Sequence, residues 1–374
     1  MHSKWIAAAL LLLLTHSGPA QAPSDYKSWN PAASTVPVLE GQAWPSEVKH
    51  PYDRLPARAE HQVRKEVWDL SENPAGLRLR FRTNSPEIKI AYQVTGALQF
   101  PHMPATGVSG MDLYAREANG KWLWCGGKFS FSDTVTYRFA DLSPGNDRDS
   151  TREYTLYLPL YNTIKWMTVS TNRESLFEPL PARNEKPIVV YGTSIAQGGC
   201  ASRPGMAWTN ILQRRLDLPL INLGFSGNGR LEKEVEELLT EVDAQLYVLD
   251  CLPNLLAPAI SANEVKKRLV TAIQLLQSKR PGVPILLTAH DGYTDDGTNA
   301  VRRRQYQDVN TALQETFDSL TAAGTKQLYL LSKQEIGMDI DCMVDGTHPN
   351  DMGMLRYAEA YEKKIRAILK AARR

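Results

Sequence analysis

Five residues in the second half of the chain are of the types that acyl transfer needs. They are Ser194, Gly227, Asn254, Asp345 and His348. A serine attacks an ester carbonyl when a histidine takes its proton, and an aspartate can hold that histidine in the required tautomer. Backbone N–H groups and an amide can stabilise the resulting oxyanion. We therefore start from the hypothesis of a serine esterase.

The candidate nucleophile, Ser194, lies in the stretch YGTSI at 191–195, where an apolar run enters a Gly-x-Ser turn. Such a turn exposes a hydroxyl and a backbone N–H at the start of a helix. Serine is also a very common helix N-cap, so the turn alone does not decide between the two roles. It is not the Gly-x-Ser-x-Gly elbow of the α/β-hydrolases, because Ala196 occupies the second glycine position.

Two loops could supply oxyanion donors. Gly227 lies in the glycine-rich stretch NLGFSGNG at 222–229, and Asn254 ends the stretch DCLPN at 250–254. Each follows an apolar strand pattern, and each taken alone is also typical of an ordinary turn. The sequence makes them candidates because both follow strand ends, as Ser194 does.

The candidate base, His348, follows Asp345 by three residues in the stretch DGTHP at 345–349. In a turn, that spacing lets both side chains face one point. A competing pair is His290 with Asp291, but neighbours on an extended strand end point apart, so we predict a structural role for His290. The remaining histidines after residue 20 are His50, His61 and His102.

The order of these motifs resembles that of the SGNH or GDSL hydrolase superfamily, whose four blocks carry Ser, Gly, Asn and His. The resemblance covers roughly residues 186–374. It implies a nucleophile at Ser194, a triad completed by His348 and Asp345, and an oxyanion hole made of the Ser194 N–H, the Gly227 N–H and the Asn254 amide. One departure is Thr193, which stands where the Gly-Asp-Ser block has its aspartate.

A second resemblance lies in the first half of the chain. The stretch GMDLY at 110–114 is similar to the Gly-x-Asp-Leu-Tyr signature of a β-sandwich domain that precedes certain secreted bacterial SGNH esterases. The resemblance leaves open whether Asp112 and Tyr114 are structural or border the cleft. Tyr114, Trp122 and Trp124 could stack on sugar rings or belong to the sandwich core.

The second half of the chain has the pattern of a parallel sheet. Continuous apolar runs predict strands at 188–191, 220–223, 246–249, 285–288 and 328–331, and helical patterns lie at 208–216, 231–240, 264–279, 302–323 and 352–372. Strands buried on both faces and joined by helices indicate a three-layer α/β domain, with its site at the carboxyl ends of the strands.

The first half is different, because its apolar residues alternate with polar ones. Such runs predict strands at 77–82, 87–92, 121–124, 134–139, 153–158 and 163–169, which favours an all-β sandwich resembling a jelly roll. The change of pattern falls in the polar, proline-bearing stretch 178–187. We therefore predict a sandwich domain at 25–180 and a catalytic α/β domain at 185–374.

Composition and the N-terminal residues narrow the functional class. The 374 residues are 43% hydrophobic and 22% charged, with a formal net charge of +2, which gives no field that would indicate a nucleic-acid partner. Residues 1–20 have the pattern of a signal peptide: a basic start at Lys4, an apolar run and small residues before the expected cut after Ala20. No cysteine follows that cut, so we predict a secreted or periplasmic enzyme with no membrane span and no lipid anchor.

The four cysteines, Cys125, Cys200, Cys251 and Cys342, allow three full pairings or remain free thiols. They contain no CxxC pair and no neighbouring histidine, and the expected chemistry requires no metal or organic cofactor. The predicted function is hydrolysis of O-acyl esters, chiefly O-acetyl groups on polysaccharide or oligosaccharide. The alternative is a lysophospholipase-like or general short-chain acyl-ester hydrolase. Acetylated carbohydrate is thus the expected partner, and oligomeric state is not determined.

Overall fold

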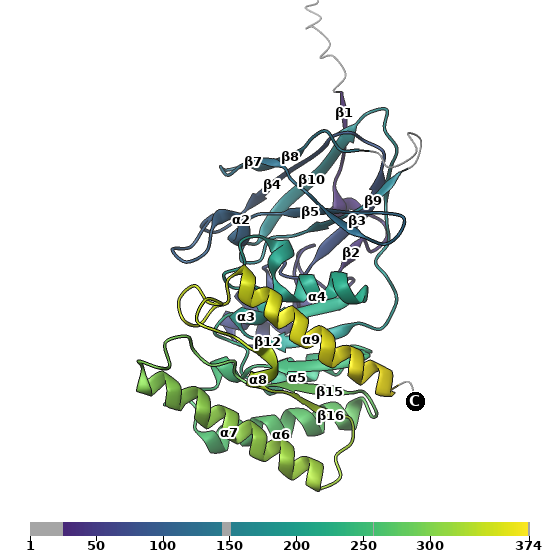
Figure 1. The fold of residues 1–374 in the computed structure, drawn as a ribbon. Helices are drawn as coiled ribbons and strands as arrows, with labels where there is room; N and C mark the ends of the chain where they lie inside the picture. The colour runs from purple at the N-terminus through teal and green to yellow at the C-terminus, as the bar shows by residue number, and fades with distance from the viewer. Residues whose placement is uncertain (1–24, 144–150, 257, 373–374) are drawn as a thin grey trace, which may run out of the picture.

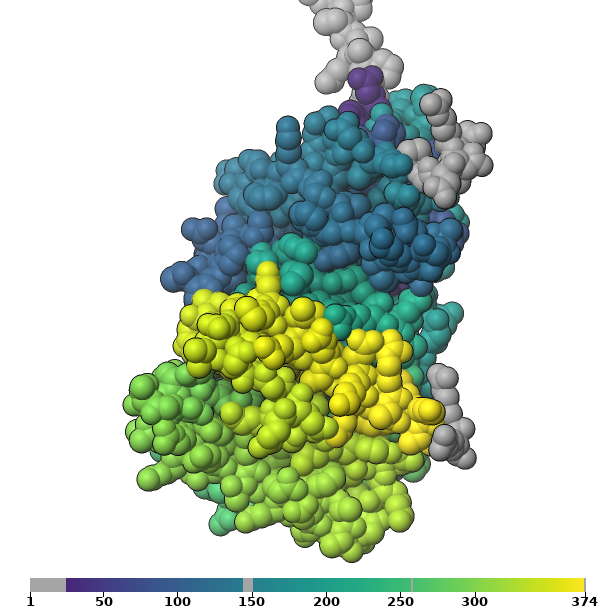
Figure 2. All heavy atoms as spheres, in the orientation of Figure 1, coloured from purple at the N-terminus to yellow at the C-terminus, as the bar shows by residue number. Residues whose placement is uncertain are grey.

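The structure is a computed structural model that describes residues 25–143, 151–256 and 258–372. A β-sandwich from the first half of the chain lies on a layered α/β region from the second half (Figure 1). The two regions meet across the width of the molecule (Figure 2). The predicted signal peptide at residues 1–20 lies outside the described residues.

The sandwich consists of two antiparallel sheets, as the alternating patterns predicted. One has the strand order β1-β10-β4-β8-β7, and the other β11-β3-β9-β5-β6 with β2 paired to β3. The alternate side chains Leu79, Phe81, Ile88 and Ile90 lie buried between the sheets. The bounds are β1 Tyr26–Trp29, β2 Leu39–Glu40, β3 Arg78–Thr83, β4 Ile88–Val94, β5 Asp112–Arg116, β6 Trp122–Cys125, β7 Lys128–Ser130, β8 Val135–Phe139, β9 Arg152–Tyr157, β10 Ile164–Asn172 and β11 Phe177–Pro179.

All six strands predicted in this half are present, but five others were not predicted. The most informative of these is β5, which pairs with β9 and β6 inside its sheet. It is buried on both faces, including the polar Asp112, because residues of the α/β region cover its outer face. Its sequence therefore lacks the alternation on which the prediction of strands depended.

The α/β region contains a five-stranded parallel sheet with the order β13-β12-β14-β15-β16. All five predicted strands are present and end within one residue of the predicted positions. Their bounds are β12 Ile188–Gly192, β13 Leu220–Gly224, β14 Leu246–Asp250, β15 Ile285–Thr288 and β16 Leu328–Leu331. The continuous apolar runs identified them because parallel strands are buried on both faces.

Helices cover both faces of this sheet and make three layers. The helices α4 and α9 lie on the face toward the sandwich, and α6 and α7 lie on the opposite face (Figure 1). Trp208 of α4 stacks on Tyr361 of α9 with ring centroids 4.2 Å apart. The bounds are α3 Ser194–Gln197, α4 Trp208–Leu216, α5 Lys233–Leu239, α6 Ala262–Lys279, α7 Ala300–Ala322, α8 Lys333–Ile336 and α9 Asp351–Ala372. No helix within the described ranges has the length and apolar character to cross a membrane.

A stretch of the first half packs on the α/β region. It includes the short helix α1 (Lys65–Ser71), and its Leu55 and Val67 belong to the same apolar cluster as Leu223 of β13. The buried Arg54 donates hydrogen bonds of 3.0 and 2.8 Å to the carbonyls of Asn222 and Gly224. These contacts support the end of β13, which precedes the glycine-rich loop.

Candidate active site

The first predicted element of the site is the turn between β12 and α3. Thr193, not Ser194, is the N-cap of α3, and its hydroxyl accepts a 3.3 Å hydrogen bond from the Ile195 N–H. Ser194 is thus the first helical residue, and capping does not occupy its hydroxyl. A Cβ at Gly192 would lie 2.6 Å from that of Ala196, so only glycine allows this tight entry into the helix.

A chain of hydrogen bonds links Ser194 to the loop before α9. The Ser194 Oγ lies 2.9 Å from the Nε2 atom of His348, and the Nδ1 atom of His348 lies 2.7 Å from the Oδ2 atom of Asp345. The other carboxylate oxygen of Asp345 accepts the backbone N–H of His348 at 2.8 Å. The structure therefore brings together the three residues that the motif order predicted, in a geometry suited to proton transfer from the serine.

Asp345 remains a carboxylate in this arrangement. Burial alone would raise its pKa, but hydrogen bonds from the ring and the backbone of His348, together with the Thr347 N–H, lower the pKa to about 2. An ionised Asp345 accepts the Nδ1 proton of His348, which leaves Nε2 as the acceptor for the serine hydroxyl. The electrostatics thus favour the tautomer that a general base needs.

The glycine-rich loop lies beside this relay. The Ser226 N–H donates to the Gln197 side chain at 2.9 Å, which ties the loop to α3, and a Cβ at Gly229 would lie 2.0 Å from the Gly192 carbonyl oxygen. Gly227 has a φ of +70°, a left-handed conformation that favours glycine. Among the hydrogen bonds of the described residues, none uses the backbone N–H of Ser194 or Gly227, so both can donate to a substrate oxygen.

Asn254 lies at the end of the short helix η4 (Leu252–Asn254), which follows β14. Its Oδ1 atom accepts a 3.2 Å hydrogen bond from the Gly229 N–H. This contact places the Asn254 side chain against the glycine-rich loop and uses its acceptor end. The Nδ2 donor end of Asn254 is therefore the end left to serve an oxyanion.

The competing histidine has different surroundings. His290 is 1% exposed, and its Nδ1 atom accepts a 2.9 Å hydrogen bond from the Gly292 N–H. Its backbone is paired with the Asn310 side chain, and its ring packs on Tyr293 at 4.7 Å between centroids. These contacts are those of a packed core residue, in line with the structural role predicted for it.

The sandwich half contributes two residues to the site that sequence reasoning missed. The Tyr161 hydroxyl donates a 3.1 Å hydrogen bond to the Ser194 carbonyl, and the ring of His102 stacks on that of His348 with centroids 5.9 Å apart. Both residues are far from the motifs in sequence. No spacing rule could have found them, and only the packing of the two halves brings them to the site.

The Gly-x-Asp-Leu-Tyr motif holds the loop that follows α3. Asp112 accepts the Gly205 N–H at 3.0 Å and pairs with the guanidinium of Arg203, which also donates to the Tyr114 hydroxyl at 2.6 Å. Asp112 and Tyr114 are thus buried structural contacts between the two halves. Tyr114 has no free face for a sugar, whereas Trp124 is largely exposed.

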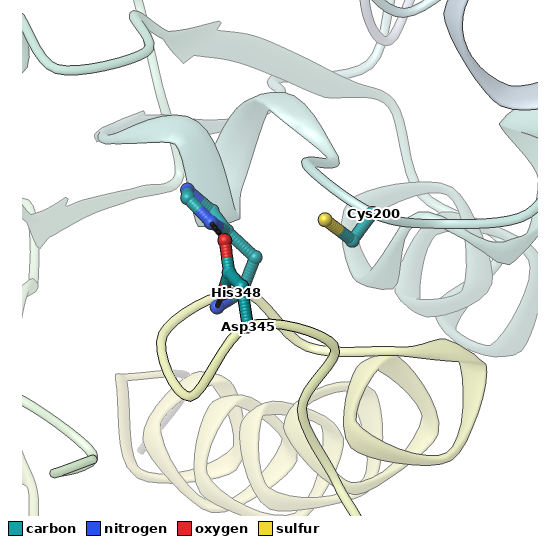
Figure 3. A group of neighbouring side chains, drawn as sticks. All are labelled: Cys200, Asp345 and His348. Atoms are coloured by element: carbon teal, nitrogen blue, oxygen red, sulfur yellow. Dashed lines mark hydrogen bonds and ion pairs between the residues drawn. The ribbon is translucent and has the colours of Figure 1, made fainter. Parts of the chain in front are cut away.

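All four cysteines are free thiols. One of them, Cys200, lies beside the relay, and potential ligand atoms of Cys200, Asp345 and His348 lie within 4.8 Å of one another (Figure 3). Burial and the neighbouring Asp345 carboxylate raise the pKa of Cys200 to about 12, which keeps the thiol protonated and makes it a weak metal ligand. A cation there would also compete with the hydrogen bond between His348 and Asp345.

Two family models match the chain. Residues 185–366 match the GDSL-like lipase/acylhydrolase family, and residues 26–177 match the GxDLY family, described as the N-terminus of SGNH-hydrolase-type esterases. A solved structure from Bacteroides ovatus ATCC 8483, described as a GDSL-like lipase, is 33% identical, with 92% of this chain and 98% of that chain covered and a TM-score of 0.82. The chain therefore belongs to the GDSL-like, SGNH-type acylhydrolase family.

More distant structures share the fold. The salicylyl-acyltransferase SsfX3 from a tetracycline biosynthetic pathway is 19% identical, with 92% and 98% coverage and a TM-score of 0.73. A family 2 carbohydrate esterase with a carbohydrate-binding domain, from Corynascus thermopiles (Myceliophthora fergusii), is 15% identical, with 79% and 94% coverage and a TM-score of 0.55. No curated protein sequence matches the chain significantly.

Proposed function

We propose that the protein is a serine esterase in which Ser194 is the nucleophile, His348 the general base and Asp345 the residue that orients it. The observation that carries the proposal is the continuous chain of hydrogen bonds, 2.9 and 2.7 Å long, from the serine hydroxyl through the imidazole to the carboxylate. In a family of acylhydrolases, this arrangement supplies an activated oxygen nucleophile.

The reaction has two acyl-transfer steps. Ser194 Oγ attacks the ester carbonyl carbon while His348 Nε2 takes its proton, and the N–H groups of Ser194 and Gly227 with the Asn254 amide stabilise the oxyanion. His348 then protonates the departing alcohol, and the acyl group remains on Ser194. Water, deprotonated by His348, attacks the acyl-enzyme and releases the carboxylic acid with the serine restored.

The proposed substrate is an O-acetyl ester on a polysaccharide or oligosaccharide. The likeness in fold to family 2 carbohydrate esterases supports this choice, as does the exposed Trp124 on the sandwich. The predicted signal peptide at 1–20 supports a secreted or periplasmic enzyme, where such polymers are met. A lysophospholipase-like or general short-chain esterase is the alternative outcome of the test below.

The test measures acetate release from acetylated polysaccharides, with p-nitrophenyl acetate and a lysophospholipid assayed in parallel. We expect acetate from at least one glycan, and no release from the Ser194→Ala variant. A fluorophosphonate probe should label the wild-type protein and not that variant. Turnover of the lysophospholipid alone would replace the carbohydrate assignment, and an unchanged rate in Ser194→Ala would overturn the nucleophile.

A further inference from the structure

A groove of about 520 Å³ opens on the sandwich, and none of its lining residues belongs to the predicted catalytic set. Its walls come from β6, β7 and β8 and from the loop that follows α3. The lining residues that matter here are Trp124, Lys128, Phe129, Ser202 and Arg203. Its volume lies within the roughly 300–1,000 Å³ range of small-molecule binding sites in proteins.

The indole of Trp124 is a rigid wall of this groove. It is 56% exposed, yet its Nε1–H donates a 2.7 Å hydrogen bond to the Asp112 carboxylate. The Arg203 guanidinium lies 4.8 Å from the ring centroid. The ring is therefore held in one orientation while much of its surface stays open to solvent, which lowers the entropic cost of binding a ligand against it.

Phe129 is a second exposed ring in the same groove. It is 54% exposed and packs against the buried Tyr137 at 5.4 Å and Phe131 at 5.5 Å between ring centroids. Lys128, Arg138 and Arg203 are among the other lining residues. A sugar ring presents C–H groups on its faces and hydroxyls at its edge, so two fixed aromatic surfaces with charged donors at the rim suit a saccharide.

One lining residue, Ser202, connects the groove to the surroundings of the catalytic relay. Cys200 lies beside His348, and Ser202, which lines the groove, is two residues further on, a span of at most about 7 Å. Ser202 also donates a 2.9 Å backbone hydrogen bond to Asp351, three residues after His348. Thr106, a lining residue from the sandwich, donates a 2.7 Å hydrogen bond to the Ser202 carbonyl, which joins the sandwich wall of the groove to the loop after α3.

We propose that this groove binds sugar residues of the polysaccharide whose ester is presented to Ser194. The inference rests on the proposed esterase function and adds a carbohydrate subsite on the sandwich, with Trp124 and Phe129 as its stacking surfaces. Charged residues, among them Lys128, Arg138 and Asp141, line the groove together with its apolar residues, and this mixed lining favours a saccharide over a long acyl chain. Contacts between the groove and sugar residues away from the ester would contribute binding energy that positions a polymeric substrate. A small ester cannot make these contacts.

The experiment separates binding from turnover. In the Ser194→Ala background, calorimetry with acetylated xylan and glucomannan oligosaccharides should show binding, and Phe129→Ala and Trp124→Ala should each weaken it about tenfold. Trp166→Ala is the matched control, because Trp166 is 41% exposed on β10 but does not line the groove. Trp124→Phe keeps a ring without the bond to Asp112, and retained binding in this variant supports stacking.

In the active enzyme, the groove substitutions should lower the ratio of kcat/KM for the glycan to kcat/KM for p-nitrophenyl acetate. Unweakened glycan binding in both Phe129→Ala and Trp124→Ala would overturn the subsite. So would a selective loss of activity on long-chain aryl esters, which would make the groove an acyl-chain site. Failure of the esterase proposal is seen separately, as an absence of acetate release and fluorophosphonate labelling in the wild-type protein.

Discussion

Two histidine–aspartate pairs in the α/β region have the same composition and opposite surroundings. Asp345 and His348 are three residues apart in a loop at the surface, and the carboxylate lies against the Nδ1 side of the ring. His290 and Asp291 are neighbours after β15 and are both buried. The three-residue spacing in the first pair lets Asp345 orient the His348 ring. In the second pair, the Nδ1 atom of His290 accepts a hydrogen bond from a backbone N–H instead.

The hydrogen bonds of the buried pair decide its character. The Nδ1 atom of His290 lies 3.3 Å from Asp291, but it already accepts the Gly292 N–H and so carries no proton to donate. His290 is thereby held as the Nε2–H tautomer. In the surface pair the proton is on Nδ1, and Nε2 faces Ser194. What makes a histidine a candidate base is therefore the partner of each nitrogen, not the presence of an acid nearby.

The largest expected effect follows from removing one histidine at a time. His348→Ala should lower kcat/KM at least about 10⁴-fold and leave the melting temperature near that of wild type, because the side chain lies in a surface loop. His290→Ala should do the reverse, with a loss of unfolding free energy on the order of 2–4 kcal/mol and near-normal activity per folded molecule. Steady-state kinetics measures the activity of each variant, and urea unfolding measures its stability. An inactive but stable His290→Ala variant would contradict the assignment of a structural role to His290 and a catalytic role to His348.

The acid of the surface pair comes next. Asp345→Asn should lower kcat about 10³- to 10⁴-fold, because an amide at that position favours the wrong tautomer of His348. Since the pKa of Asp345 is lowered to about 2, the carboxylate is ionised throughout the neutral range. Its contribution to stability is complete above its ordinary pKa of about 4 and is lost as pH falls toward 2. A rate profile of the wild type that shows an Asp345-dependent limb near neutral pH would contradict this.

A smaller effect on kcat is expected at Asn254, the proposed oxyanion donor. Asn254→Ala should lower kcat about 10²- to 10³-fold. Asn254→Asp separates the two roles of the side chain. It keeps an oxygen that accepts the Gly229 N–H, but a second carboxylate oxygen replaces the Nδ2 donor. Both variants should be slow and folded. Recovery of the rate in Asn254→Asp would show that Asn254 serves only to hold the loop.

The last prediction concerns stability, with little effect on catalysis expected, at Asp250, a buried neighbour of the His290–Asp291 pair. Burial raises the pKa of Asp250 to about 7, although a hydrogen bond from Tyr361 opposes the rise. The unfolded chain releases this proton near pH 4 and the folded chain near pH 7, so stability falls as pH rises between these values. Asp250→Asn should remove that loss, worth on the order of 1–4 kcal/mol at pH 8. Thermal unfolding at pH 5 and pH 8 checks it, and an unchanged difference between the two pH values would contradict it.

The two halves of the chain were not equally predictable. The strand predicted at 188–191 was evident because its four residues, IVVY, form a continuous apolar run in a strand buried on both sides. The strand at 112–116 was missed because Asp112 is buried there by partners from the other half, Arg203 and Gly205. Alternation of apolar and polar residues indicates a strand with one face buried in the core of its own sandwich and the other face exposed to solvent. The alternation is lost when another region of the chain covers the outer face of the strand, as happens in β5.

The sequence by itself determined the parallel sheet, the sandwich and the order of Ser194, Gly227, Asn254, Asp345 and His348, because local patterns and short motifs carry that information. Only the tertiary structure decided that Tyr161 and His102 lie at the site, that Arg203 is held by Asp112, and that Trp124 and Phe129 line one groove. These contacts join residues far apart in the chain. They depend on how the two halves pack, which no local periodicity records.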